Sequence, residues 1–214
     1  DVFLENFAPG VAGRLGLGYP EVRAANPGIV YCSVSGYGQQ GPYRDRPAYD
    51  LILQGLGGLQ GITGEPGRDP VRIGVAVADI AGGMFAAYVI VAALLHRTRT
   101  GEGDCVDVSL LDSQLAWLTY MAANYFATGQ NPVPAGSRHP TIVPYQAFAP
   151  RDGFLNISVG NDDIFVRLCE ALGRPDLVER QYSEDPRTCD EVAALFATRT
   201  RKEWETLAKD NDFC

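Results

Sequence analysis

Apolar and polar residues follow two different patterns along the chain, and the patterns divide it into two parts. Three short stretches, residues 1–7, 28–38 and 105–112, have the composition of strands. The first is apolar and extended, the second is rich in β-branched and aromatic residues, and the third alternates apolar with polar positions. Helix-like stretches lie between them, and such alternation favours a parallel sheet. We therefore predict an α/β domain over residues 1–130.

The longest apolar run extends from Ile80 to Leu95 and contains no charged residue. It is shorter than the roughly 20 apolar residues that cross a membrane. Its small residues suit close packing inside a protein: Gly82, Gly83, Ala86 and Ala87. Basic residues follow the run, where the helix dipole favours positive charge, and Gly101 is a typical helix end. The pattern predicts a buried core helix and no membrane partner.

The second part of the chain, residues 131–214, has a different organisation. A helical pattern over 113–129 closes the first part, and a segment rich in Pro, Gly and Ser follows at 130–144. Residues 145–160 read as two strands around a turn. Three amphipathic helices are then predicted, in the stretches 161–173, 189–200 and 201–210. This part is predicted to be a linker followed by a smaller α+β domain.

Composition narrows the function classes. The chain of 214 residues is 46% hydrophobic and 21% charged, which indicates a globular rather than a disordered protein. The net charge is −8 and the basic residues do not cluster, so no nucleic-acid partner is expected. Neither the two histidines nor the cysteines have the spacing of a zinc site, and no metal is predicted. Scattered cysteines without a CxxC pair indicate reduced thiols and a cytoplasmic protein: Cys32, Cys105, Cys169, Cys189 and Cys214.

Asp79 stands directly before the long apolar run and has two interpretations. An aspartate before an apolar helix is a common N-cap, and this requires no further function. A carboxylate at a helix N-terminus is also kept ionised by the helix dipole, and beside an apolar wall it can act as a nucleophile toward an acyl group. Gly82 and Gly83 would let a ligand approach closely. Local sequence does not choose between the two.

Five sequence blocks, taken together and in order, carry information about fold and function that no single block provides. They are "DVFLENFAPGVAGRLGLGY", "NPGIVYCSVSGYGQQGPYRDRPAYDLILQ", "VADIAGGMFAA", "LLHRTRTGEGDCVDVSLLD" and "GSRHPTIVPYQAF". Together they resemble family III CoA-transferases of the CaiB/BaiF type, a family that includes formyl-CoA transferase, carnitine CoA-transferase and the 2-methylacyl-CoA racemases. The resemblance implies a Rossmann-like large domain, a smaller α+β domain and a homodimer of interlocked subunits. Family members are longer, so this chain is expected to be a piece that lacks both ends, inactive by itself.

The resemblance assigns chemistry to Asp79, which falls on the family's AD-x-x-(A/S)-G motif. It implies that this carboxylate attacks an acyl-CoA and carries CoA, as an aspartyl thioester, to a free carboxylic acid through two anhydrides. Acyl-CoA and a carboxylic acid are the implied substrates, with no permanently bound cofactor. The implied CoA-binding residues are Asn6, Phe7, Ala8, Arg14, Arg46, Tyr49 and Asp50.

Several of these assignments have structural alternatives. Arg14 suits phosphate oxygens, yet it also reads as a solvated helix residue; Asn6 reads as a turn former and Phe7 as a core residue. Formyl-CoA transferase has a lysine about where Pro47 stands, so Arg44 or Arg46 could take over that contact or be plain surface charges.

Tyr49 separates two activities of the family. The racemase branch has His-Asp where this chain has Tyr49-Asp50, and its chemistry needs the imidazole as an acid or base. A tyrosine, with an ordinary pKa near 10, replaces it poorly, so transferase is favoured over racemase. A CoA-binding or dimerisation module without activity is a third possibility.

The loop "AGSRHPTIVPYQ" corresponds to a glycine-rich loop of formyl-CoA transferase. Here it carries Gly136, Arg138 and His139. Arg138 could attract the acceptor carboxylate and His139 could donate a hydrogen bond, although a single histidine in a proline-rich loop is more often structural. The departure from a glycine-rich loop argues against formyl and oxalate as acyl groups and leaves the acid open, with dicarboxylates, aromatic acids and carnitine-like acids as candidates.

Overall fold

The computed structural model describes residues 1–180 and 186–213. The chain divides into two compact units, Asp1–Pro134 and Ala135–Cys214, which are described separately here. Of the five cysteines, Cys32, Cys105, Cys169 and Cys189 are free thiols, and Cys214 lies outside the described residues.

The first unit is built on a parallel three-stranded sheet. Its strands are β1 (Val2–Glu5), β2 (Val30–Ser35) and β3 (Asp104–Ser109), in the order β1-β2-β3. The register pairs Val2 with Val30, and Val30 with Asp104. Every residue of the central strand β2 is buried, as expected for a β-branched and aromatic run covered on both faces. The predicted strands and their parallel arrangement are confirmed.

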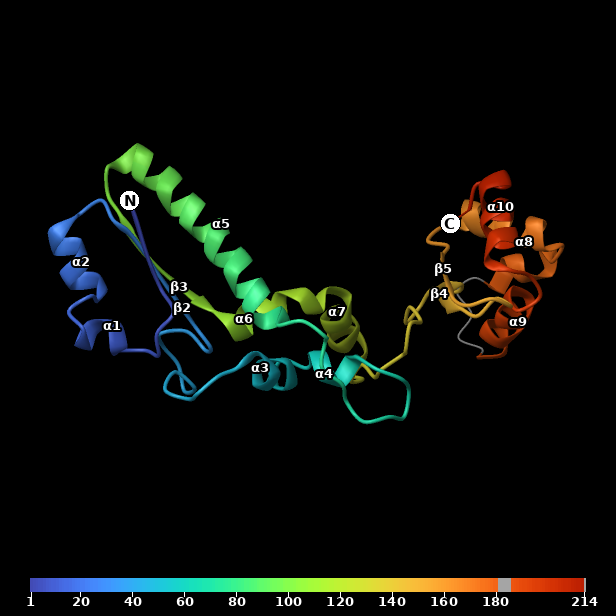
Figure 1. The fold of residues 1–214 in the computed structure, drawn as a ribbon, viewed down its shortest axis with the longest axis horizontal. Coiled ribbons are helices and arrows are strands. Elements are labelled where there is room, and N and C mark those ends of the chain that lie inside the picture. The colour runs from blue at the N-terminus through green and yellow to red at the C-terminus, as the bar shows by residue number, and fades with distance from the viewer. Residues whose placement is uncertain (181–185, 214) are drawn as a thin grey trace. The chain divides into compact units, whose positions relative to one another are not determined.

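Alternation along β2 directs its side chains to helices on opposite faces of the sheet. Cys32 and Val34 pack with Ala86 of α5 (Val77–Thr100) and Val108 of β3. Tyr31, which directly precedes Cys32, turns the other way, and its hydroxyl donates to the carbonyl oxygen of Leu17 at 2.9 Å. Figure 1 shows α5 alongside the sheet, with α1 (Val11–Arg14) and α2 (Tyr19–Ala25) on the other side.

Helix α5 differs from the predicted buried core helix in two ways. It is longer, at 24 residues, and it ends at Gly101 in a left-handed conformation as predicted. It is also only partly buried, because one side packs on the sheet while Ile80, Tyr88 and Val91 are exposed. By length and composition alone, α5 could cross a membrane, since its most apolar 18 residues have a mean hydropathy of 2.0 and about a third of them are buried. A core helix of a soluble protein can have the same length and composition.

Short helices complete the first unit. The glycine-rich stretch after residue 48 forms α3 (Asp50–Leu56) and α4 (Leu59–Ile62). The single helix predicted over 113–129 is wrong in detail. It is three pieces, α6 (Leu110–Leu115), the 3-10 turn η1 (Ala116–Leu118) and α7 (Thr119–Thr128). The break falls at Thr119, a β-branched residue with φ of 41°.

The second unit is a hairpin covered by helices. Strands β4 (Tyr145–Phe148) and β5 (Leu155–Ser158) pair antiparallel, as predicted. The predicted amphipathic helices are α8 (Asp162–Leu172), α9 (Pro186–Phe196) and α10 (Arg201–Asp210), with a 3-10 turn η2 (Pro175–Arg180) between the first two. Their apolar sides enclose Phe165, Phe196 and Trp204, and the indole N–H of Trp204 donates to the carbonyl oxygen of Phe196 at 2.8 Å.

Candidate active site

A groove of about 410 Å³ opens where β1 and β2 end and α5 begins. Ligands of open parallel sheets bind beyond the carboxyl ends of the strands, so this is the expected place for a site. The groove is lined by Asn6, Phe7, Ala8, Pro9, Ser35, Gly36, Arg44, Arg46, Pro47, Ala48, Tyr49, Asp50, Asp79 and Leu110. Segments that are distant in sequence therefore contribute Asp79 and six of the seven residues that the resemblance assigns to CoA.

Asp79 lies in the first turn of α5, at its third position, and its side chain is exposed in this groove. The N-cap is Ala76, so the interpretation of Asp79 as the helix N-cap is wrong. Partial burial, and after it the negative charge of Asp50, raise the pKa of Asp79 above that of an ordinary aspartate. The carboxylate is thus accessible to an electrophile in the groove while part of its surface is withdrawn from water.

The carboxylate of Asp50 does the capping that local sequence assigned to Asp79. Its Oδ1 accepts the backbone N–H of Ala78 at 3.0 Å, one of the N–H groups that a helix start leaves unpaired. Its Oδ2 accepts a hydrogen bond from the side-chain amide of Gln54 at 2.8 Å. Asp50, predicted to contact CoA, lines the groove, but both of its oxygens already have partners within the protein.

Arg14 is absent from the lining of this groove and approaches it from α1. Gly10 lies between Arg14 and the groove residue Arg44. A Cβ built at Gly10 would be 3.4 Å from Nη1 of Arg14 and 3.8 Å from Nη2 of Arg44. Gly10 has φ of 82°, which a side chain would make unfavourable. Two guanidinium groups therefore flank an open backbone turn, an arrangement suited to phosphate oxygens.

Aromatic side chains form the exposed wall of the groove. Phe7 is 45% exposed and Tyr49 is 78% exposed. The interpretation of Phe7 as a core residue is therefore wrong. The guanidinium of Arg46 lies 3.9 Å from the centre of the Tyr43 ring, a cation–π contact that holds it at the rim. The amide of Asn6 donates to the carbonyl oxygen of Val34 at 2.7 Å and fixes the turn after β1.

The three predicted substrate-loop residues belong to the second unit. Gly136 has φ of 62°, and the Arg138 guanidinium donates to Oε1 of Gln146 at 3.3 Å. The ring of His139 packs against Tyr145, with 5.2 Å between ring centres, and its Nδ1 accepts the N–H of Thr141 at 3.2 Å. These contacts fold the loop onto β4. Their relation to Asp79 stays a prediction.

Sequence reasoning missed Ser35, Gly36 and Leu110, which also line the groove. The hydroxyl of Ser35 is buried and has no hydrogen-bond partner among the described residues. Its place at the last position of β2 is the signal that could have found it, because that end of a parallel strand faces the ligand side.

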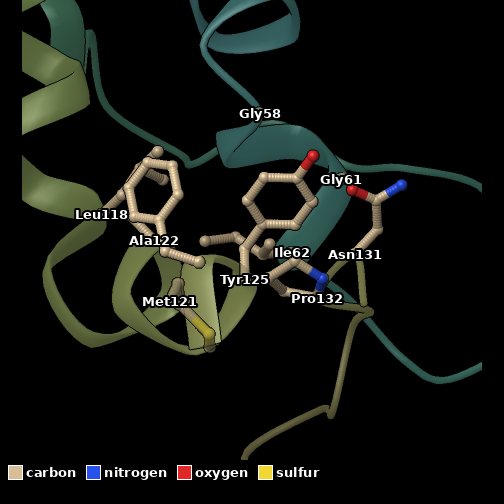
Figure 2. A pocket seen from close by; sticks show the side chains of 10 residues that line it. Gly58, Gly61, Ile62, Leu118, Met121, Ala122, Tyr125, Asn131 and Pro132 are labelled. Carbon is tan, nitrogen blue, oxygen red and sulfur yellow. The ribbon is translucent and has the colours of Figure 1, made fainter. Parts of the chain in front are cut away.

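Two further hollows lie in the first unit. One of about 310 Å³ continues from Asp79 along α5 and is lined mainly by apolar residues, among them Leu4, Val34 and Ala86. The other, about 410 Å³, shares no residue with the Asp79 groove. Figure 2 shows it between Ile62 of α4 and Met121 and Tyr125 of α7.

Comparison with known proteins connects this geometry to one chemistry. A family model described as CoA-transferase family III matches residues 1–214. The chain is 43% identical over 206 residues to succinate–glutarate CoA-transferase of Agrobacterium fabrum, covering 94% of this chain and 52% of that protein. It is 47% identical over 179 residues to succinyl-CoA:glutarate CoA-transferase of Mus musculus, covering 84% and 41% respectively.

A solved structure of the same family has a similar fold. The crystal structure of a CaiB/BaiF family protein from Brucella suis superposes with a TM-score of 0.79 at 38% identity, covering 98% of this chain and 58% of that one. The chain spans about half the length of the curated relatives that it matches.

Proposed function

Since this chain belongs to CoA-transferase family III, we propose that it carries the active site of an enzyme that moves CoA from an acyl-CoA to a free carboxylic acid. The observation that carries the proposal is the carboxylate of Asp79, exposed in the first turn of α5 within a groove that arginines and aromatic side chains line. Arg14 and Arg44 flank the Gly10 turn, where we place the CoA phosphates.

The proposed reaction uses Asp79 as nucleophile. Its carboxylate oxygen bonds to the thioester carbon, the C–S bond breaks, and CoA leaves as a thiolate, which gives a mixed anhydride. The thiolate then attacks the Asp79 carbonyl carbon, releases the donor acid as a carboxylate and forms an aspartyl-CoA thioester. The acceptor carboxylate reverses both steps: it expels the thiolate to form a second anhydride, and the thiolate takes the acceptor acyl group and frees Asp79.

For the acids, we propose dicarboxylates of four or five carbons. Two relatives above 40% identity are named for succinate or succinyl-CoA together with glutarate. A third relative, 42% identical over 188 residues, is named acetyl-CoA:oxalate CoA-transferase and comes from Acetobacter aceti. Oxalate should therefore be tested as an acceptor acid beside the dicarboxylates of four or five carbons. Tyr49 stands where the racemase branch has a histidine, and we therefore keep racemisation only as an outcome of the test.

The experiment traps the covalent intermediate in the complete natural protein. The protein is incubated with succinyl-CoA, glutaryl-CoA or acetyl-CoA, treated with hydroxylamine, and digested for mass spectrometry. We expect a hydroxamate at Asp79 that requires an acyl-CoA, and loss of both the label and the transfer of CoA to glutarate in the Asp79→Asn variant.

Asp45→Asn is the matched control, because Asp45 is an exposed carboxylate of the same region whose side chain lies 3.9 Å from Arg44. It should keep the label. Exchange of the α-proton with deuterated water without any label at Asp79 would replace the transferase proposal with racemisation.

A further inference from the structure

Gln54 is a buried polar residue that the proposed reaction does not use. It lies on α3, its side chain is fully buried, and it is not among the residues that line the Asp79 groove. Burying an amide is costly unless its donors and acceptor are paired. The partners of Gln54 therefore indicate what the residue is for.

The amide of Gln54 connects α3 to the segment that leads into α5. Its Nε2 donates to Oδ2 of Asp50 at 2.8 Å and to the carbonyl oxygen of Val75 at 3.2 Å. Its Oε1 accepts the N–H of Ile73 at 2.8 Å. Both N–H groups and the carbonyl of the side chain are thus engaged, and the segment before α5 is held at two backbone positions.

Asp50 passes this connection on to the start of α5. Held by Gln54 through Oδ2, the carboxylate uses Oδ1 to accept the N–H of Ala78 at 3.0 Å. Ala78 immediately precedes Asp79 in the first helical turn. The chain of contacts therefore runs from Gln54 through Asp50 to the backbone of the residue next to Asp79.

We propose that Gln54 is a positioning residue, which holds Asp50 against the first turn of α5 and thereby sets the direction in which the Asp79 carboxylate points into the groove. The proposal rests on the role proposed for Asp79. A residue with only a packing role would affect the stability of the protein but not the reactivity of Asp79, whereas a positioning residue affects that reactivity.

The main test uses Gln54→Glu in the complete protein. A protonated glutamic acid can donate its one O–H to Asp50 and accept from Ile73, losing only the bond to the carbonyl oxygen of Val75, whereas an ionised one repels Asp50. Besides Asp50, the titratable side chains on the groove are Asp79, Arg44, Arg46 and Tyr49, and they are the same in both proteins. We expect the variant-to-wild-type ratio of kcat to rise at least fivefold as the pH falls from 8 to 5.5.

The second variant is Gln54→Leu, which cannot donate at any pH. We expect kcat for CoA transfer to fall at least tenfold while KM for the acyl-CoA changes by less than about threefold, since the groove lining stays intact. Gln60→Leu is the matched control. Gln60 lies on α4, and its side-chain amide donates to the carbonyl oxygen of Leu51 at 3.0 Å rather than to Asp50 or to the segment before α5.

Hydrogen exchange provides a readout that needs no reaction. In Gln54→Leu, the amide N–H groups at the start of α5 should exchange at least tenfold faster, with the rest of α5 unchanged. If wild-type Asp79 is never labelled but this loss of protection occurs, the transferase proposal fails and the positioning contact stands. A pH-independent kcat ratio for Gln54→Glu, its failure to fold at any pH, or unchanged exchange in Gln54→Leu would each overturn the positioning proposal.

Discussion

Asp79 illustrates how a carboxylate acquires its properties from residues that are distant in sequence. Its own position, in the first turn of α5, exposes it to the positive end of the helix dipole. Its pKa is nevertheless raised, first by partial burial and second by the charge of Asp50. The carboxylate that caps the helix is therefore also one that makes Asp79 harder to ionise.

This arrangement predicts a pH dependence. Only the ionised form of Asp79 attacks a thioester, and a raised pKa means that this form is lost at a higher pH than for an ordinary aspartate. As the pH falls, hydroxamate labelling should therefore decline before an ordinary carboxylate would protonate. Asp50→Asn removes the neighbouring charge, and the acid limb of labelling against pH should move to lower pH. An acid limb that stays in place would rule out the influence of Asp50, and Asp45→Asn should leave the limb where it is.

At the same scale, sequence reasoning identified Asp79 and most of the groove residues but not Asp50's capping role. The resemblance assigned roles to aligned positions, and these included residues that do meet at one groove. The capping contact joins positions 28 residues apart. No local pattern encodes it, because the helix start at Ala76 has no capping side chain of its own.

Among the elements, α5 contributes Asp79 to the groove, and two of its glycines have opposite surroundings. A Cβ at Gly82 would collide with the side chain of Leu110, a groove residue, whereas one at Gly83 would meet open space. The close approach to Leu110 therefore requires a glycine at position 82 but not at position 83.

Gly82 and Gly83 are expected to respond in opposite ways when each is replaced by alanine. Gly83→Ala should stabilise the chain by about 0.5–1 kcal/mol, because alanine has the higher helix propensity. Gly82→Ala should destabilise it by about 1–3 kcal/mol, as overpacking does. Urea denaturation followed by circular dichroism measures both; equal effects would contradict the close approach of α5 to α6.

The hydrophobic pattern of the sequence was sufficient to predict some helices and strands but not the burial of α5. The strands, the hairpin and the three amphipathic helices were predictable for two reasons. Strand β3 and the amphipathic helices have a clear period, and β2 is a short β-branched and aromatic run of the kind that is buried on both faces. Helix α5 was expected to be buried all round because it is apolar all round, yet part of its surface is exposed. Apolar composition indicates what a helix can bury, while the neighbouring elements determine what it does bury.

The whole molecule comprises two units, and the predicted change of organisation near residue 130 is close to the observed division after Pro134. The first unit holds the Asp79 groove, and the second holds the loop of Arg138 and His139. The interlocked homodimer and the cytoplasmic location remain predictions. Both concern a complete protein about twice the length of this chain, judging from its relatives.

The two outer strands of the sheet differ in the side chains that they expose. Strand β3 carries Asp104 and Asp107, whose charges discourage pairing with another strand. Strand β1 exposes Val2 and Leu4, with Leu4 58% exposed. Leu4→Lys in the 214-residue chain should therefore reduce concentration-dependent self-association, measured by light scattering, without loss of helical signal. Equal scattering by both proteins would show that β1 does not drive association.

The exposed side of β1 also has a practical meaning for anyone who prepares this chain. An unprotected apolar strand acts as a template on which other molecules can add, so solutions of the isolated chain should become turbid on warming or storage well before the sheet itself melts. Shelf life, rather than melting temperature, would then set the conditions under which the protein can be handled.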